Sequence, residues 1–466
     1  MRTRRWPRFV AATLFLVLLV LNLYVFFNRE WEASYYPSSY ATLYYPLDVP
    51  TIREWKVVGR DRIQLDIASV AEVKSWNVLT DGQNPQSAAG MQPVFKIDTT
   101  FSVLHTYRLV PVPEGACQDV EISIRFYSTE FYASLGMQHE DVYIVRSNVP
   151  CGKFEQYAVA DWIDRYAYVG KEGLAEADRV LREDVKIVEG EPTLARMEKL
   201  AHFLKGKLAN TGGVPKDDER WMNPLLLYKE MVAGTGKGWC TQNAQLWVFW
   251  ANRAGIPTRF VFVARTQDNT IVYNGHSFAE SFVREYNRWV CTDFMDGVIA
   301  VFDKTGLPLN AADLFLLNQH NAFDSTVARI YINKRWADQL RLGTLDTVVT
   351  APYALCSSAI KDELTSHSIL KYRRPPNVED VREIYTGFFK DWTYFTANID
   401  RYFFKPPLAF SLYPTEGKET YFVRQLLLFL LLAVLFVWML FIVLGRRGTQ
   451  AAPQQEPEKT ADVLRT

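Results

Sequence analysis

The stretch 236–296 constrains the fold more than any other part of the chain, because it places a thiol at the start of a helix. Cys240 follows a Gly/Trp-rich turn and precedes an apolar, helix-like segment, 244–251. Gly255 and Pro257 end this helix, since glycine readily adopts the left-handed cap conformation and proline cannot continue the helical hydrogen bonds. A thiol at a helix N-terminus lies near unpaired N–H groups and the positive end of the helix dipole, which favour the nucleophilic thiolate.

Two further residues complete a candidate site. His276 and Asp293 lie in two short β-like runs, NGHSFAESFV and RWVCTDF, that are joined by the polar turn 284–288. Antiparallel strands joined in this way bring the two side chains roughly opposite each other, although a slip of one residue in the register would reverse the facing. The carboxylate then accepts from one imidazole nitrogen, and the other nitrogen faces the thiol of Cys240.

The order of these motifs resembles the transglutaminase-like superfamily, of the membrane-anchored bacterial type. The core of that superfamily contains a G-x-C helix, a G-I-P-x-R turn, an H-x-x-x-E strand and a W-x-x-x-D strand. The corresponding segments here, within about 193–296, are Gly238–Cys240, Gly255–Arg259, His276–Glu280 and Trp289–Asp293. The resemblance implies a papain-like α+β core in which Cys240, His276 and Asp293 are catalytic.

The sequence also departs from the family pattern. Phe278 stands where the family often has tryptophan, and Cys291 lies close to the predicted triad. In the family, a loop before the nucleophile commonly forms one wall of the acyl-binding cleft, which implies that Trp221 and Asn223, after the loop 210–219, are cleft residues. Tryptophan is equally common as a core residue.

The predicted chemistry is attack of the Cys240 thiolate on an amide or ester carbonyl to give a thioester. With water as the acceptor, the protein is an amidase or protease, and with an amine it is an acyltransferase. The predicted substrates are protein, peptide or cell-envelope amides. The alternative is a catalytically inactive envelope scaffold or binding protein, because some superfamily members keep the fold and lose the chemistry. No cofactor and no metal are predicted, since the chain lacks the acidic loops of calcium-dependent family members.

Two apolar runs, 9–27 and 426–444, are long enough to span a bilayer as helices. Arginines precede the first run, and Arg446 and Arg447 follow the second. This charge pattern predicts that both termini are cytoplasmic and that 28–425 lies on the far side of the membrane. A cleaved signal peptide is the competing interpretation of the first run, but no small-x-small cleavage site follows it. The prediction is a multi-pass protein of the bacterial inner membrane with a periplasmic main domain.

Composition sets the remaining limits. At 466 residues, with 48% apolar residues, the chain can bury a large core. Its 52 basic and 52 acidic residues leave no net charge, so nothing favours nucleic acid as a partner. Short alternating runs with turn residues between them, from about 52 to 150, are typical of a β-sandwich.

The predicted organisation follows from these patterns. In chain order it is a cytoplasmic N-terminus 1–8, a transmembrane helix 9–27, a β-sandwich-like extracytoplasmic domain 28–150, a transglutaminase-like core 151–300, a C-terminal extension of the core 301–422, a transmembrane helix 423–445 and a disordered cytoplasmic tail 446–466.

Cysteine usage agrees with an oxidising compartment. Of the 5 cysteines, four remain if Cys240 is the nucleophile. Proximity in sequence favours the disulfides Cys117–Cys151 and Cys291–Cys356 among three possible connectivities. The alternative is that all four are buried thiols.

Overall fold

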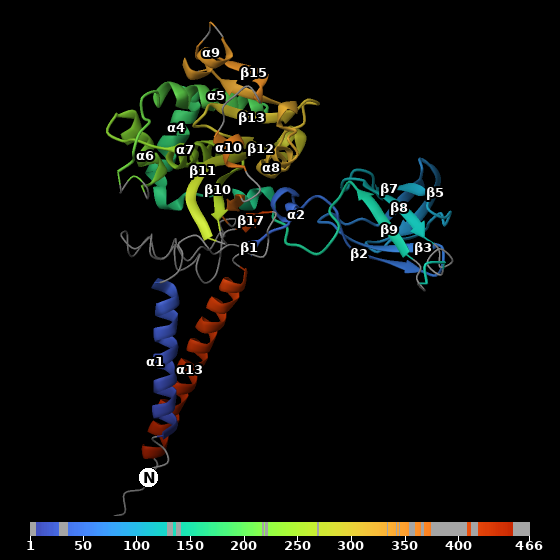
Figure 1. The fold of residues 1–466 in the computed structure, drawn as a ribbon, viewed down its shortest axis with the longest axis horizontal. Coiled ribbons are helices and arrows are strands. Elements are labelled where there is room, and N and C mark those ends of the chain that lie inside the picture. Colours follow the sequence, from blue (N-terminus) through green and yellow to red (C-terminus); the bar gives the residue numbers. More distant parts are fainter. Residues whose placement is uncertain are drawn as a thin grey trace, which may run out of the picture. The chain divides into compact units, whose positions relative to one another are not determined.

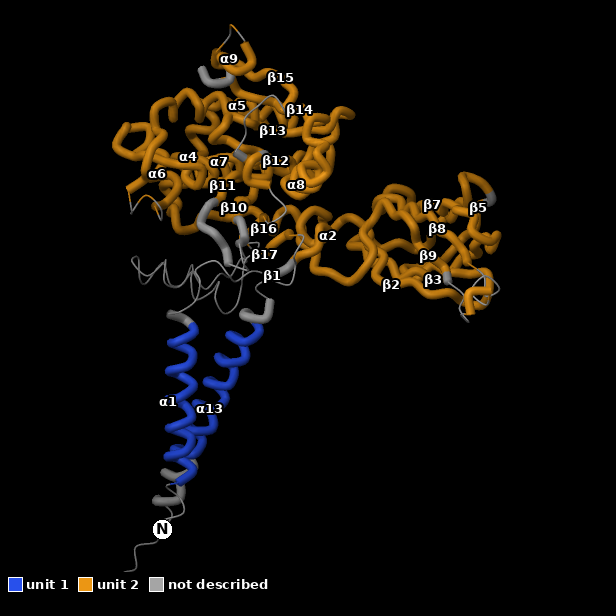
Figure 2. Tube along the Cα trace, in the orientation of Figure 1, with its two compact units in different colours: residues 1–35, 397–406, 415–466 blue, residues 36–396, 407–414 orange. Residues whose placement is uncertain are grey.

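The structure is a computed structural model that describes residues 6–27, 36–127, 134–136, 141–216, 219, 222–267, 270–332, 334–341, 343, 345–353, 359–364, 368–373, 408–411 and 418–450. The chain divides into two compact units (Figure 2). One unit comprises 1–35, 397–406 and 415–466, and the other comprises 36–396 and 407–414. All described strands belong to the second unit.

Two long apolar helices, α1 (Trp6–Phe27) and α13 (Lys418–Gln450), form the described part of the first unit and pack against each other (Figure 1). Both contain a stretch long and apolar enough to cross a membrane. The amide Nδ2 of Asn22 donates to the carbonyl of Leu427, at 3.2 Å, and so links the two helices. Helix α13 includes 446–450, the start of the segment predicted to be disordered, and 451–466 lies outside the described residues.

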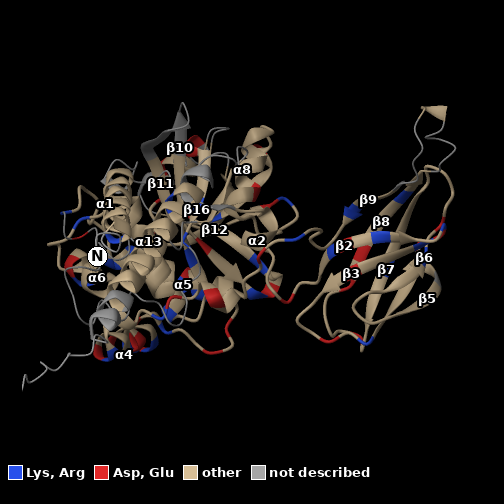
Figure 3. Ribbon diagram, turned by 90° about the horizontal axis from the view of Figure 1, so that it is seen from below, with Lys and Arg blue, Asp and Glu red and all other residues tan. Residues whose placement is uncertain are grey.

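Residues 51–147 form two antiparallel sheets, with strand orders β2-β3-β6 and β5-β4-β7-β8-β9. Side chains of both sheets, including Ile63, Trp76 and Leu109, meet in one apolar cluster because alternate residues of each strand point to the same face. The strands are β2 (Thr51–Val58), β3 (Arg62–Ala68), β4 (Ser75–Thr80), β5 (Gln83–Ala89), β6 (Val94–Lys96), β7 (Leu104–Val112), β8 (Val120–Tyr127) and β9 (Asp141–Ser147). Acidic and basic residues are interspersed along the chain (Figure 3).

The rest of the second unit is organised around a six-stranded sheet with the order β1-β17-β16-β10-β11-β12. Its strands are β1 (Tyr36–Pro37), β10 (Thr258–Gln267), β11 (Thr270–Val283), β12 (Arg288–Thr292), β16 (Ser368–Tyr372) and β17 (Leu408–Phe410). All neighbours are antiparallel except β1 and β17. A separate three-stranded sheet contains β13 (Val298–Asp303), β14 (Thr326–Tyr331) and β15 (Val348–Pro352).

Helices cover both faces of the six-stranded sheet, so that β11 buries side chains on both sides. Ala279 and Val283 pack into the cluster that contains α5 and α7, whereas Phe278 and Phe282 pack into the cluster that contains α2 and α8. The helices of this unit are α2 (Tyr40–Tyr44), α4 (Lys171–Val180), α5 (Thr193–Lys207), α6 (Pro224–Val232), α7 (Cys240–Arg253), α8 (Ala311–Gln319), α9 (Lys334–Leu340) and α10 (Ala359–Glu363). Short 3-10 or π turns are η2 (Val159–Trp162), η3 (Ala167–Val169), η4 (Leu181–Val185), η6 (Arg284–Tyr286) and η7 (Phe323–Ser325).

Candidate active site

Cys240 is the first residue of α7, which confirms the predicted position of its thiol at a helix start. The N–H of Trp239 donates to Oε1 of Gln242 at 3.1 Å, and Nδ2 of Asn243 donates to the Trp239 carbonyl at 2.9 Å. Gly238 has to be glycine because a Cβ atom there would lie 2.7 Å from Cβ of Gln242. The sequence around the thiol therefore determines the sharp entry of the chain into the helix.

The end of α7 also matches the sequence prediction. Gly255 follows the helix in the left-handed region, with φ of 72°, and the N–H of Ile256 donates to the carbonyl of Ala251 at 2.9 Å. The side chain of Asn252 then bonds to the N–H and the carbonyl of Thr258, at 2.8 and 2.9 Å. These bonds fix the turn that leads from α7 into β10.

His276 lies in β11 and pairs with Val263 of β10. Gly275 before it allows close approach of the two backbones, since a Cβ atom there would lie 2.0 Å from the Val263 carbonyl oxygen. The pairing of β11 with β12 places Ala279 opposite Thr292, so Asp293 follows directly at the end of β12. Nε2 of His276 lies 2.8 Å from Oδ2 of Asp293. The structure thus brings these two predicted residues into contact, along a diagonal rather than directly across the strands.

The thiol of Cys240 lies near the imidazole of His276 and the backbone N–H of Ser277, and both groups lower its pKa. Because Nε2 of His276 faces Asp293, Nδ1 is the nitrogen left to face the sulfur. The hydroxyl groups of Thr241 and Ser277, 2.9 Å apart, tie the start of α7 to β11 beside this contact. The structure therefore brings the three predicted site residues together, with His276 bonded to Asp293 and electrostatically coupled to Cys240.

The electrostatics of this chain favour a thiolate and an imidazolium. Burial by itself raises the pKa of the Cys240 thiol, but the hydrogen bonds from His276 and Ser277 outweigh it and hold that pKa below its ordinary value. Burial by itself lowers the pKa of His276, but the charge of Asp293 and the hydrogen bonds with Asp293 and Cys240 raise it to about 11. Both shifts stabilise the charged forms of the pair.

The loop 210–219, predicted to border the nucleophile, is bonded to the residues just before Cys240. The N–H of Gly238 donates to the Thr211 carbonyl at 2.9 Å. The N–H of Lys237 donates to the buried carboxylate of Glu219 at 3.3 Å. The loop thus supports the turn that carries the thiol, and the sequence showed no signal for the role of Glu219.

The two predicted cleft residues have different outcomes. Trp221 lies outside the described residues. Asn223 is the N-cap of α6, and its Oδ1 accepts from the N–H groups of Leu225 and Leu226, at 2.9 and 3.4 Å. Its side chain is therefore used to begin a helix.

The arginine of the G-I-P-x-R turn and the glutamate of the H-x-x-x-E strand form a buried ion pair. Nη2 of Arg259 lies 2.7 Å from Oε2 of Glu280, and the two side chains are 3% and 0% exposed. The guanidinium group lies 4.1–4.9 Å from the centroids of four aromatic rings, those of Tyr44, Trp162, Trp289 and Tyr372. This arrangement fixes β10 against β11, four residues along the strand from His276.

Residues far away in the sequence satisfy the remaining polar groups of this pair. Nη1 of Arg259 donates to the carbonyl of Leu43, and the Tyr44 hydroxyl donates to Oε1 of Glu280 at 3.0 Å. The N–H of Ala311 donates to the same oxygen at 2.7 Å. Helix α2 therefore completes the packing of the strand that carries His276, which the motifs alone did not indicate.

The predicted Cys117–Cys151 disulfide is wrong for this structure, in which both residues are free thiols. Cys117 packs beside the apolar cluster of the two antiparallel sheets, whereas Sγ of Cys151 donates to the nearby carbonyl of Val149. Proximity in sequence did not bring the two sulfurs together, because bonding needs a close approach with a specific geometry.

The predicted Cys291–Cys356 disulfide has only one of its residues in the described part of the chain. Cys291 is a free, fully buried thiol, and burial raises its pKa well above the ordinary value. Cys356 lies outside the described residues. Because the thiolate is the reactive form, Cys291 is an inert neighbour of the site.

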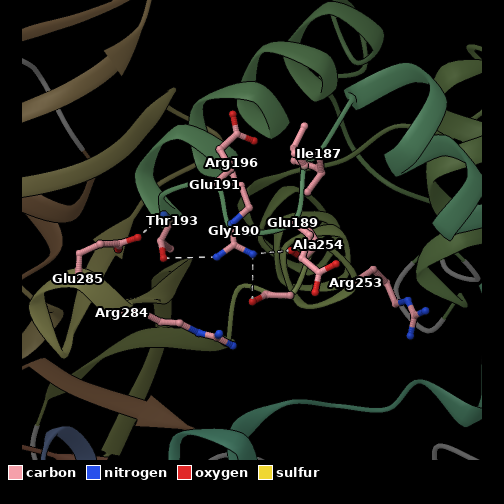
Figure 4. A pocket seen from close by; sticks show the side chains of 12 residues that line it. Ile187, Glu189, Gly190, Glu191, Thr193, Arg196, Arg253, Ala254, Arg284 and Glu285 are labelled. Atoms are coloured by element: carbon pink, nitrogen blue, oxygen red, sulfur yellow. Dashed lines mark hydrogen bonds between the residues drawn. The ribbon is translucent and has the colours of Figure 1, made fainter.

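A pocket of about 530 Å³ lies at the opposite end of α7 from Cys240 (Figure 4). Arg196 is at its centre, and its Nη1 donates to the carbonyl of Ala254 at 3.1 Å. The 14 residues of α7 correspond to about 20 Å at 1.5 Å per residue, so this pocket is separate from the candidate site. Within the described residues, no group of three or more His, Cys, Asp or Glu side chains is placed to hold a metal ion.

A thiol at a helix start, an imidazole on a neighbouring strand and a buried carboxylate, on a mixed helix and sheet fold, define a papain-like Cys–His–Asp arrangement. Residues 187–294 match the family model of the transglutaminase-like superfamily, so the chain carries a domain of that superfamily, as its motifs predicted. The matched range includes Cys240, His276 and Asp293. None of the curated proteins compared with the chain matches it.

Proposed function

We propose that this protein is a membrane-anchored cysteine acyl hydrolase or acyltransferase that acts through a thioester on protein, peptide or cell-envelope amides. The single observation that carries the proposal is the placement of the Cys240 thiol beside His276, whose imidazole is hydrogen-bonded to the buried carboxylate of Asp293. A transglutaminase-like domain over 187–294 is consistent with protein or peptide substrates.

In the proposed mechanism, the Cys240 thiolate attacks the carbonyl carbon, and the imidazolium of His276 gives its proton to the leaving amine. The product is a thioester, and water or an amine then attacks it while neutral His276 accepts a proton from the incoming group. Asp293 holds Nε2 of the imidazole and stabilises its charged form. The N–H of Trp239 already donates to Gln242, so the N–H of Cys240 is the better donor to the developing oxyanion.

The proposal includes the location of the site. Helices α1 and α13 serve as two transmembrane anchors, both termini are cytoplasmic, and the domain with the thiol is extracytoplasmic at a bacterial inner membrane. The length and apolar composition of the two helices support this, as do the arginines outside both runs. The strands of 51–147 form a β-sandwich that packs or positions neighbouring parts. No cofactor, metal or nucleic acid takes part.

The test is formation of an acyl-enzyme on Cys240. The detergent-solubilised full-length chain is mixed with p-nitrophenyl acetate at pH 7, the initial burst of p-nitrophenol is recorded, and the acetylated cysteine is located by mass spectrometry. We expect acetylation at Cys240 and a loss of at least about tenfold in burst rate for His276→Ala, the change that one unit in an effective pKa produces. Cys117→Ser is the matched control and should keep the burst.

Two outcomes decide between the enzyme and the inactive scaffold. If the burst rate of the double variant of Cys240→Ser and His276→Ala is little lower than that of either single variant, the two groups act as one unit. If Cys240 is acetylated no faster than Cys117, and His276→Ala changes nothing, the enzyme proposal is wrong and the scaffold stands.

A further inference from the structure

Lys205, in the last turn of α5, directs its ammonium group at the turn that follows Asp293. Its Nζ donates to the carbonyl of Met295 at 2.9 Å and lies 4.5 Å from the centroid of the Phe294 ring. No motif in the sequence singles out this residue, and the proposed mechanism does not use it.

The turn that receives Lys205 is also connected to the helix of the nucleophile. The ring of Phe294 stacks on Trp247 of α7, with centroids 5.4 Å apart and an interplanar angle of 22°. The N–H of Val298 donates to the carbonyl of Asp293 at 2.9 Å and closes the turn. Phe294 therefore contacts both α7 and the ammonium group of Lys205.

The carboxylate of Asp293 needs such support because one of its oxygens has no hydrogen bond. The side chain is fully buried, Oδ2 bonds to His276, and Oδ1 has no partner among the described residues. With Oδ1 unbonded, the bond from His276 to Oδ2 is the hydrogen bond that orients the carboxylate. Electrostatic attraction from a nearby cation restrains it.

The charged groups that act on Lys205 are Asp293 and Asp296. Loss of hydration of its half-buried side chain lowers the pKa of Lys205 to about 8, against the opposing effect of the two carboxylates. The ammonium group is thus charged at neutral pH, where it attracts Asp293.

We propose that Lys205 is a positioning residue for the site: by holding the turn after Asp293 through the Met295 carbonyl and the Phe294 ring, and by attracting the Asp293 carboxylate, it keeps that carboxylate against His276. This inference rests on the proposed function, because it assigns Lys205 a role only if the Asp293–His276 contact tunes the Cys240 thiol. Without the lysine, the Asp293 carboxylate stabilises the imidazolium of His276 less well. The thiolate of Cys240 is then less populated near neutral pH.

The experiment follows alkylation of Cys240 by iodoacetamide in the detergent-solubilised full-length chain between pH 5 and 10, mapped by mass spectrometry. Lys205→Met removes the charge and the hydrogen bond, Lys205→Arg keeps a cation, and Lys207→Met is the matched control on the exposed side of the same helical turn. We expect Lys205→Met to shift the midpoint of the pH profile upward by about one unit, which lowers the alkylation rate about tenfold at pH values well below the wild-type midpoint. Lys205→Arg and Lys207→Met should stay within about twofold of the wild type.

A purely structural role would lower stability without moving the pH midpoint, and that result would overturn the inference. An unchanged profile for folded Lys205→Met overturns it too. If this variant does not fold, Lys205→Gln replaces it in the same comparison, because glutamine can still donate to Met295. His276→Ala separates the two proposals: if it leaves the profile unchanged, the proposed function fails, whereas if only Lys205→Met leaves it unchanged, the role of Lys205 fails alone.

Discussion

Replacement of Glu280 by glutamine removes the negative charge from a buried ion pair and leaves Arg259 without a counter-charge. The arginine cannot reach water, since its side chain is 3% exposed and aromatic rings surround its guanidinium group. Removing one partner of a buried pair destabilises a protein by about 3–5 kcal/mol, because the remaining charge stays desolvated. For Glu280→Gln we expect the free energy of unfolding to fall by about 3 kcal/mol, near the lower end of this range, since glutamine retains an oxygen that can accept from the N–H of Ala311.

A second ion pair in the same unit provides the control. Glu198 pairs with Arg329, but these side chains are 28% and 35% exposed. Water screens such a pair, so Glu198→Gln should lower the free energy of unfolding by less than about 1 kcal/mol. Both substitutions remove one carboxylate charge, and they differ chiefly in burial.

The assay is guanidinium chloride denaturation of the full-length chain in one detergent, followed by tryptophan fluorescence. Thermal unfolding gives a second measure, in which about 3 kcal/mol corresponds to a shift of roughly 6–12 °C for a domain of this size. Equal losses for Glu280→Gln and Glu198→Gln would refute the reasoning. So would a loss below about 1 kcal/mol for Glu280→Gln.

Three further predictions concern reactivity, topology and packing. His276→Ala should reduce iodoacetamide labelling of Cys240 at pH 6–7 by at least about tenfold. The raised pKa of His276 and the lowered pKa of Cys240 keep the thiolate populated in that range. Equal labelling of the wild type and His276→Ala contradicts this. Reporter fusions after Arg447 and within 60–400 should report opposite sides of the membrane, and a C-terminus on the same side as 60–400 would overturn the topology. Tyr44→Phe should lower the free energy of unfolding by about 1.5–3 kcal/mol, the value of a hydrogen bond to a charged group, and no change would exclude a role for the Tyr44 hydroxyl in the ion pair.

Local sequence determined much of the site. The start of α7 at Cys240, its end before Gly255 and the strands around His276 and Asp293 follow from residues only a few positions apart. Helix capping, left-handed glycine and short strand patterns depend on neighbours in the chain, so they can be read before the fold is known. The apolar runs behind α1 and α13 are equally local.

The tertiary structure decided which of these local elements meet. The contact between His276 and Asp293 depends on strand register, since a slip of one residue would have turned one of the two side chains to the other face of the sheet. The Cys117–Cys151 prediction failed because distance along the chain does not measure distance in space. The partners of Arg259 and the contacts of Lys205 with Phe294 and Met295 come from elements far apart in sequence. Such contacts arise only when whole helices and strands pack to bury their apolar faces, and no short pattern of residues encodes that packing.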